Sequence, residues 1–358
     1  MSSPARRNLT LRMSTTSTFL TPAEAELLGR ARTGDDRAYG ELVDPHRRSL
    51  HAHCYRMLGS LEDADDAMQD ALLRAWRGIG RFQGRSSLRT WLYTIATNAC
   101  LRIVQRRPRR VLPRDHGPSA AAGTPPGAPL AETVWIEPYP EDEMPVASDA
   151  PSPGARYEAR ETLELAFVAA LQHLPPRQRA VLLLREVLDF SAREAAELLE
   201  TSVPAVNSAL QRARQTLGER APERSQQVTL RELGDERSRG LVTAYVDANE
   251  HADVDRVLAL LTEDAAWSMP PQSRWYQGRE PVTAFLTGSP FRERWRHLPT
   301  AVNGQLAVGC YLWDAERGDF EAGVIDVLTL RGDRIAEVTA FIGGERFPRF
   351  GLPARLPA

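Results

Sequence analysis

The chain has 358 residues, enough for two or three domains that each bury a core of their own. Hydrophobic residues make up 42% and charged residues 26%, which is typical of a globular protein, and the apolar runs are too short to predict a membrane span. The three cysteines, Cys54, Cys100 and Cys310, lack the paired spacing of metal ligands. We therefore expect them to be small core side chains in a reducing cytoplasm, and we predict no metal or cofactor.

Charge is distributed unevenly along the chain. The formal net charge is −2, and all 45 basic side chains other than histidine are arginines. Eleven arginines and no acid lie between Asp70 and Asp115, whereas seven acids and no arginine occur from Asp115 to Ala155. A uniformly solvated surface would mix both signs, so this segregation predicts a polyanion-binding segment beside an acidic tether.

Hydrophobic period and composition divide the chain into five parts. Residues 1–20 are a Ser/Thr-rich leader with a disordered composition, residues 21–107 have a helical period, and residues 108–154 are rich in Pro, Ala and Gly. Residues 155–220 are helical again, and residues 237–350 combine helices with alternating strands. We predict a multidomain fold: two all-α domains joined by a linker unable to bury a core, then an α+β domain.

Two helices of the first domain carry the polar side chains of interest. One begins with acids and ends with arginines, as the helix dipole favours, and it places Asp63, Asp66 and Asp70 on one polar face. The other, residues 89–107, is rich in arginine and contains Trp91. Arginine beside aromatic rings suits phosphate contact and base stacking. A solvated acidic face and a core tryptophan are the alternative interpretations.

The second helical domain has the pattern of a helix-turn-helix. Ser191 and Glu194 form a capping box, and Ser202 can cap the next helix. The expected buried face of that helix consists of Val203, Val206, Leu210, Ala213 and Leu217. Its opposite, polar face presents Asn207, Ser208, Gln211 and Arg212. The pattern predicts a helix that enters a major groove, although a plain helical hairpin has the same pattern.

The order of these motifs is similar to that in RNA polymerase sigma factors of the extracytoplasmic-function (ECF) type. Residues 66–76 and 82–98 resemble their second domain, and residues 171–217 resemble their fourth. The resemblance implies two partners, core RNA polymerase and promoter DNA. For core polymerase it implies contacts by Asp66, Gln69, Asp70 and Trp76. For the minus-ten element it implies contacts by Arg85, Arg89, Trp91, Asn98 and Arg102. Asn98 matches the position that contacts a flipped base, and its amide suits a base edge. For the minus-thirty-five element we expect Asn207, Ser208, Gln211 and Arg212.

The C-terminal part, residues 240–350, resembles the SnoaL-like proteins, in which a bent sheet wraps helices around an apolar pocket. Strands are expected at residues 322–330 and 335–342, with a hairpin turn between them. The resemblance implies a small-molecule pocket with the candidate lining residues Tyr245, Trp267, Met269, Trp275, Phe285 and Phe341. Asp326 is the acid positioned to point into this pocket, but strand alternation allows it equally to face solvent.

Residues 134–140 form an apolar island in the linker, similar to one in an actinobacterial subgroup that also has a C-terminal extension. It would form a transient cluster or dock on polymerase or on the third domain.

We interpret the chain as an ECF-type sigma factor, not an enzyme, with a C-terminal domain that acts as a built-in regulator. Two alternatives stay open. One is a ligand-responsive DNA-binding regulator that does not bind core polymerase, and the other is a sigma factor whose third domain retains cyclase or isomerase activity through Asp326.

Overall fold

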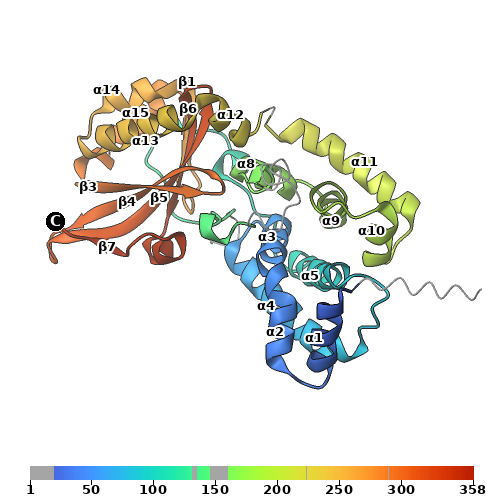
Figure 1. Ribbon diagram of the computed structural model, residues 1–358. Helices are drawn as coiled ribbons and strands as arrows, with labels where there is room; N and C mark the ends of the chain where they lie inside the picture. The colour runs from blue at the N-terminus through green and yellow to red at the C-terminus, as the bar shows by residue number, and fades with distance from the viewer. Residues whose placement is uncertain (1–19, 131–134, 146–159, 223, 289) are drawn as a thin grey trace, which may run out of the picture.

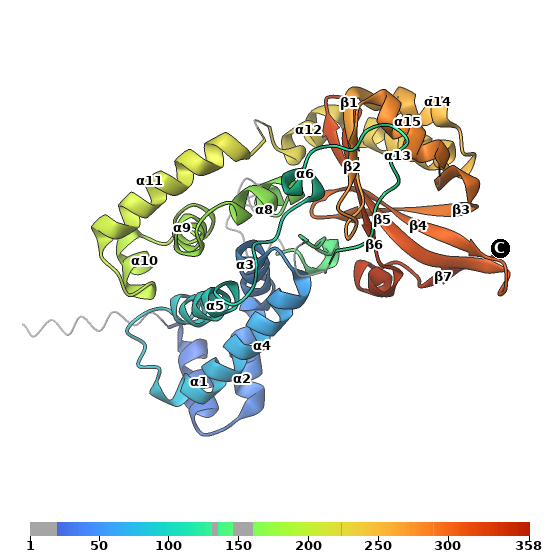
Figure 2. The same cartoon turned by 180° about the vertical axis from the view of Figure 1, so that it is seen from behind.

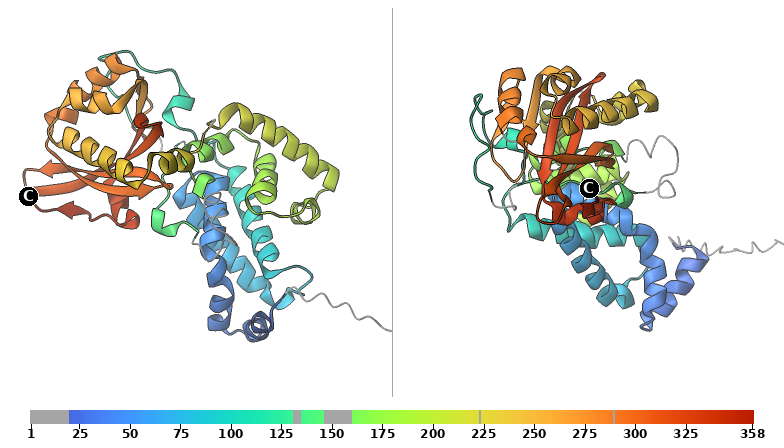
Figure 3. Two further views of the ribbon diagram at one scale, coloured as in Figure 1. Left: turned by 45° about the horizontal axis from the view of Figure 1, so that its top comes forward. Right: turned by 90° about the vertical axis from the view of Figure 1, so that its left-hand side faces the viewer.

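The computed structural model describes residues 20–130, 135–145, 160–222, 224–288 and 290–358. Figure 1 shows a C-terminal sheet domain beside two groups of helices, and the left view of Figure 3 shows the same separation from another direction. The expected leader, apart from Leu20, lies outside the described residues. The fold class is as predicted, with two helical domains followed by an α+β domain.

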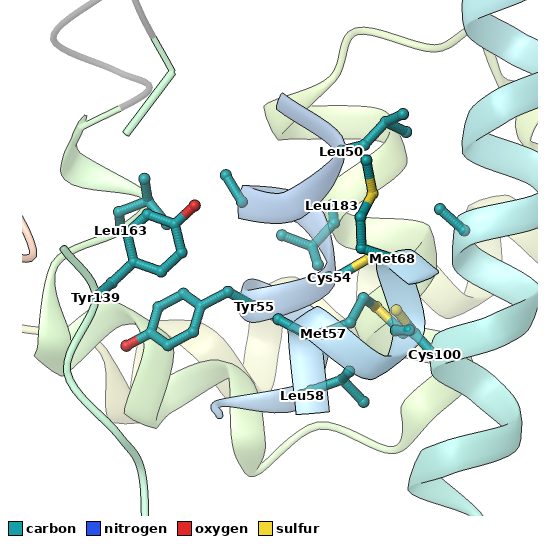
Figure 4. Packing of buried hydrophobic residues seen from close by; sticks show 14 of the residues in the cluster. Leu50, Cys54, Tyr55, Met57, Leu58, Met68, Cys100, Tyr139, Leu163 and Leu183 are labelled. Carbon is teal, nitrogen blue, oxygen red and sulfur yellow. The ribbon is translucent and has the colours of Figure 1, made fainter. Parts of the chain in front are cut away.

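The first helical domain forms where polar caps and buried apolar faces recur along the chain. Its helices are α1 (Pro22–Arg32), α2 (Asp36–Val43), α3 (Arg47–Leu58), α4 (Leu61–Gly78) and α5 (Leu88–Val104). Ser60 and Ser87 accept hydrogen bonds from first-turn amides of α4 and α5 and so begin these helices. α3 packs against both α4 and α5, and Cys54 and Cys100 are buried near this contact (Figure 4).

The second helical domain contains the predicted helix-turn-helix. It consists of α8 (Leu165–Gln172), α9 (Pro176–Leu182) with a π-helical turn (Leu183–Val187), α10 (Ala192–Leu198) and α11 (Val203–Arg220). The capping box at Ser191 is confirmed, and Ser202 caps α11. Val206, Leu210 and Ala213 are buried as expected. Val203 is 38% exposed, contrary to expectation, because it lies in the first turn of α11, before the face that packs against α9.

The C-terminal domain is a twisted sheet covered by helices. Its helices are α12 (Gln226–Leu233), α13 (Asp235–Glu250), α14 (Val254–Leu260) and α15 (Arg279–Gly288). Its strands are β1 (Leu261–Ser268), β2 (Trp275–Gln277), β3 (Trp295–Val302), β4 (Gln305–Asp314), β5 (Asp319–Arg331), β6 (Arg334–Ile342) and β7 (Arg355–Leu356). The strand order is β2-β1-β6-β5-β4-β3, with β7 paired to β5. Only β1 and β6 pair in parallel among these strands.

The two faces of the sheet have different neighbours. On β5, Asp326 and Leu328 face the side covered by α13 and α15, whereas Ile325 and Val327 pack in the core shared with the helical domains. Alternate side chains of β5 therefore face opposite sides of the sheet, and Asp326 points inward rather than to solvent. Phe341, on β6, lies in the shared core on the opposite face, so its predicted place in the pocket is wrong.

The linker has a definite path in its described parts, contrary to the expectation that it buries no core. After α5 the chain forms a short helix, α6 (Pro113–His116), and then runs along β2, where the amide of Ala120 donates to the carbonyl of Trp275 (2.7 Å) (Figure 2). Trp135, Ile136 and Tyr139 of the apolar island are buried, while Val134 lies outside the described residues. Composition failed here because three apolar side chains are enough to dock a polar segment on an existing surface.

The island completes a core that runs through several parts of the chain. Tyr139 lies beside Tyr55 of α3, with ring centroids 4.6 Å apart, and Leu163, just before α8, is buried close by (Figure 4). The same cluster of buried side chains includes residues of β3 to β6. The island therefore docks on the third domain, as one of the sequence alternatives had it, and on the first helical domain as well.

Candidate functional site

The predicted polymerase-binding face of α4 is open to solvent in part. Asp66 and Gln69 are exposed, and Leu73, one turn further on, is 48% exposed. Trp76 is half-buried and meets the ring of Tyr39 edge-on, with centroids 5.0 Å apart. Leu73 adds one apolar side chain to this face, and sequence reasoning had not singled it out.

Asp63 does not belong to this exposed face, contrary to the sequence interpretation. It is buried, and its carboxylate accepts a hydrogen bond from the guanidinium of Arg110 at 2.8 Å and pairs with Arg107. Both arginines follow α5, so they approach the N-terminal end of α4 from the next segment of chain. Three-residue spacing placed Asp63 with the acids, but a tertiary ion pair removes it from solvent.

Asp70 connects the predicted polymerase surface with the predicted minus-ten surface. Its Oδ1 accepts from Arg74 at 2.7 Å and its Oδ2 accepts from Arg102 of α5 at 2.8 Å. Burial raises the pKa of Asp70, but the hydrogen bonds from the two guanidinium groups outweigh burial and hold that pKa below its ordinary value. Asp70, expected to bind polymerase, and Arg102, expected to bind DNA, thus form an ion pair with each other in this structure.

The remaining residues predicted to bind the minus-ten element lie along α5 and the loop before it. Arg85 is exposed, Asn98 is half-buried, and Trp91 is half-buried with its ring 4.9 Å from that of Phe82. Trp91 is therefore partly a core residue and partly accessible.

Arg89 is held by the second helical domain. Its Nη2 donates to the carbonyl of Leu188 at 2.7 Å, and its guanidinium lies 4.6 Å from the ring centroid of Phe190. Sequence reasoning did not foresee this contact, since the two partners lie 99 residues away along the chain or further. The guanidinium of Arg89, which was expected to contact DNA, is thus bonded to the second helical domain.

The polar face of α11 is fully presented to solvent. All four predicted minus-thirty-five residues are exposed, namely Asn207, Ser208, Gln211 and Arg212. Between Glu200 and Glu219 no acid occurs, so no carboxylate in this part of the helix repels a phosphate. This surface meets the geometric requirement for a recognition helix.

Asn303 lies at the point where the three domains and the linker meet. Its amide nitrogen donates to the hydroxyl of Tyr55 (3.0 Å) and to the carbonyl of Leu163 (2.7 Å), and its side-chain oxygen accepts from the amide of Tyr139 (2.8 Å). Asn303 and Gly304 both have positive φ and form the tight turn between β3 and β4. An Asn-Gly pair favours such a turn, but neither the turn nor its interdomain role was predicted from the sequence.

The start of α4 is held by the island and by the C-terminal domain. Glu137 accepts hydrogen bonds from the amide of Leu61 (2.7 Å) and the hydroxyl of Ser60 (2.9 Å), which caps the helix. Arg349, after β6, binds Asp65 on α4, with 2.9 Å between Nη2 and Oδ1. Burial raises the pKa of Asp65, but its bonds to Arg349 and a histidine hold that pKa well below the ordinary value.

A cavity of about 210 Å³ lies between the sheet and its helices. Four of the expected residues line it: Trp267, Met269, Phe285 and Asp326. Tyr245 lies behind Asp326 and donates to its Oδ2 at 2.9 Å. Trp275 does not line the cavity, because its indole N–H donates to the carbonyl of Gly117 in the linker at 2.8 Å.

The polar groups of the cavity come from neighbouring strands. Burial raises the pKa of Asp326 to about 6, although the hydrogen bonds from Tyr245 and from Cys310 Sγ (3.4 Å) lower it in part. His297, on β3, also lines the cavity, and burial lowers its pKa to about 4, so it is neutral at pH 7. His297 was missed because the sequence showed β3 less clearly than β5 and β6.

Within the described segments, no group of three or more potential ligands is placed to hold a metal ion. The same residues include no helix of the length and apolarity that crossing a membrane requires.

Family models match the chain in the order of its domains. Residues 42–110 match Sigma-70 region 2, residues 164–217 match Sigma-70 region 4, and residues 242–338 match the SnoaL-like domain. Each match coincides with one of the structural domains described above.

Relatives and solved structures agree with this order. The chain is 42% identical to the ECF RNA polymerase sigma factor SigG of Mycobacterium tuberculosis over 331 residues, which cover 91% of this chain and 86% of SigG. It is 32% identical to the ECF sigma factor SigM of the same organism, over 54% of this chain and 83% of SigM. The crystal structure of the M. tuberculosis ECF sigma factor SigJ shares the fold, with a TM-score of 0.54 at 22% identity, covering 86% of this chain and 97% of SigJ. This chain therefore belongs to the family of ECF RNA polymerase sigma factors and carries a SnoaL-like domain at its C-terminal end.

Proposed function

We propose that this chain directs core RNA polymerase to promoters and that its SnoaL-like domain regulates this activity by holding the two sigma regions together. The polymerase would bind the exposed face of α4, around Asp66, Gln69, Asp70 and Trp76. The minus-ten element would meet Arg85, Arg89, Trp91, Asn98 and Arg102. The minus-thirty-five element would meet Asn207, Ser208, Gln211 and Arg212 on α11.

The observation that carries the regulatory proposal is the set of hydrogen bonds made by Asn303. One buried side chain of the SnoaL-like domain bonds to Tyr55 in sigma region 2, to Tyr139 in the linker and to Leu163 beside region 4. Separation of either sigma region from the SnoaL-like domain would break at least one of these buried hydrogen bonds. The arrangement in which both sigma regions pack on the SnoaL-like domain, called the closed arrangement below, therefore depends on that domain.

In the closed arrangement, side chains on or beside the proposed DNA- and polymerase-binding surfaces are bonded to other parts of the protein. Arg89 of region 2 binds the carbonyl of Leu188 in region 4 instead of promoter DNA. Arg349 binds Asp65, beside the exposed face of α4. Polymerase binding would have to break some of these contacts, so the closed arrangement should inhibit.

A second candidate function, acid–base catalysis in the cavity, is favoured by one observation. Asp326 is a buried carboxyl whose pKa, about 6, lies in the range that suits a general base. We propose regulation without turnover, because the interdomain contacts need no chemistry. Turnover of a small molecule by the full chain, abolished in Asp326→Asn, would support the enzyme instead.

The test of the proposed function is the Asn303→Gly variant. Glycine keeps the positive φ of this turn and removes the side-chain amide, so three hydrogen bonds are lost, each contributing about 1 kcal/mol. We expect severalfold more promoter-dependent transcription with purified core polymerase than the unaltered chain gives, with the same start site.

The matched control is Asp333→Gly, in the turn between β5 and β6, where the side chain is exposed. It should transcribe like the unaltered chain. If Asn303→Gly, shown to be folded by circular dichroism, also transcribes like the unaltered chain, the regulatory role is wrong. If neither protein supports initiation at any promoter in a genomic library, the sigma activity is wrong.

A further inference from the structure

The cavity of the SnoaL-like domain is lined by aromatic rings and carboxylates. Its four rings are those of Trp267, Phe285, Phe291 and Trp295. Although the chain contains 45 arginines, none of the described ones lines this cavity. His297 is the basic side chain that does line the cavity, and it is neutral at pH 7 because burial lowers its pKa. Apolar side chains thus make up most of the lining, and its carboxylates have no cationic neighbour among the described lining residues.

Asp326 is the centre of this negative charge. It is 5% exposed, and both of its hydrogen bonds, from Tyr245 and Cys310, end on Oδ2. No cation pairs with it among the described residues, and burial raises its pKa accordingly. A buried carboxylate without a counter-charge is unfavourable, so a positively charged group beside Oδ1 would be stabilised.

We propose that this cavity binds an organic cation, an ammonium group carried on one aromatic ring or an apolar body of similar size. The ammonium would lie between Asp326 and the faces of the surrounding rings, as in aromatic sites for cations. Glu293, an exposed carboxylate at the same cavity, would attract the ligand to its entrance. The volume of about 210 Å³ suits the size, since a cavity of about 150 Å³ holds benzene.

One wall of the cavity is shared with the linker. Met269 and Gln272 face the cavity, whereas Pro270 and Pro271 between them line a second pocket together with the linker island. The carbonyl of Pro271 also accepts from the amide of Leu130 in the linker at 2.9 Å. A ligand packed against Met269 would restrain this segment and favour the docked linker. This consequence rests on the proposed regulatory function, whereas the binding itself does not.

The experiment is a calorimetric titration of the full-length chain with 2-phenylethylamine and with 2-phenylethanol, which differ in charge but hardly in shape. We expect the amine to bind at least tenfold more tightly. Asp326→Asn keeps the size of the side chain and should remove most of this preference. Glu293→Gln, on the surface, should weaken the amine several-fold and leave the alcohol unchanged, and it gives an answer even if the buried variant does not fold.

Equal or tighter binding of the alcohol would overturn the proposed charge of the ligand, and binding of neither probe would overturn the site. The linker is followed separately by hydrogen exchange of the Leu130 amide, which the amine should slow. Unchanged exchange with a bound amine would overturn the coupling to the linker and leave the site intact. A failure of the proposed function itself is recognised independently, because it is tested by Asn303→Gly without any ligand.

Discussion

At the scale of single residues, Glu164 shows how one buried carboxylate joins two domains. It precedes α8, and its two oxygens accept from the backbone amides of Gln226 (2.9 Å) and Gln227 (2.7 Å) in the first turn of α12. Burial raises the pKa of Glu164 from 4.5 to about 7, although both hydrogen bonds lower it. The folded chain therefore holds this proton more tightly than the unfolded chain does. The contribution of Glu164 to stability is thus largest below pH 4.5 and decreases until the pH passes about 7.

Glu164→Gln tests this linkage, because glutamine does not titrate. The free energy of unfolding of the unaltered chain, relative to the variant, should decrease by at most about 3 kcal/mol between pH 4.5 and pH 8. Urea denaturation at several pH values measures this difference. Glu197→Gln, on the exposed side of α10, is the control for exchanging a glutamate for glutamine at the surface. A free-energy difference for Glu164→Gln that stays constant between pH 4.5 and pH 8 would contradict the raised pKa.

At the scale of elements, α4 and α11 expose their proposed binding faces to different degrees. The start of α4 is capped by Glu137 from the linker, and its Asp65 binds Arg349 from the SnoaL-like domain. The polar face of α11 is exposed along its length. Polymerase binding through α4 should therefore respond to the other domains more than duplex binding through α11 does.

Two arginines of α11 give a matched pair for testing duplex binding. Arg212 lies on the predicted recognition face, whereas Arg214 binds Glu186 at the π-helical turn. Arg212→Ala should weaken binding of a duplex that contains the minus-thirty-five element by about 1–3 kcal/mol, and Arg214→Ala should weaken it much less. Fluorescence anisotropy at fixed salt measures both. Equal losses would show that α11 acts only through its overall charge.

At the scale of the whole molecule, the two sigma regions and the SnoaL-like domain share one continuous core. Tyr55, Tyr139 and Leu163 lie close together (Figure 4). Asn303 forms hydrogen bonds with all three residues, and all four side chains are buried. Removing the SnoaL-like domain would expose this surface as well as remove the proposed regulator. Experiments on regulation are therefore clearer in the full chain than in a truncated one.

Labels on regions 2 and 4 should show the opening directly. The native cysteines are buried, so cysteines introduced at the exposed positions Arg81 and Arg193 can be labelled selectively. We expect the distance between these labels, measured by energy transfer, to increase when core polymerase binds. A pair at Arg193 and Gln215, both within region 4, should not change. A constant distance in the first pair would contradict an inhibitory closed arrangement.

The sequence by itself determined the local elements and their order. Ser191 and Ser202 predicted the helix starts of the helix-turn-helix, and alternation predicted β5 and β6, because caps and periodicity are properties of neighbouring residues. The polar face of α11 followed from the same periodicity. These features, together with the family resemblance, were sufficient for the fold class and the family.

Only the tertiary structure decided which faces meet. Alternation left Asp326 with two orientations, and the packing of α13 on the sheet selected the inward one. Composition predicted a linker that buries no core, whereas Trp135 and Tyr139 are buried and Tyr139 packs against Tyr55 of α3. The role of Asn303 depends on partners 140 to 248 residues away along the chain. Local patterns carry no information about such pairs, because long-range contacts form only when separate faces bury each other.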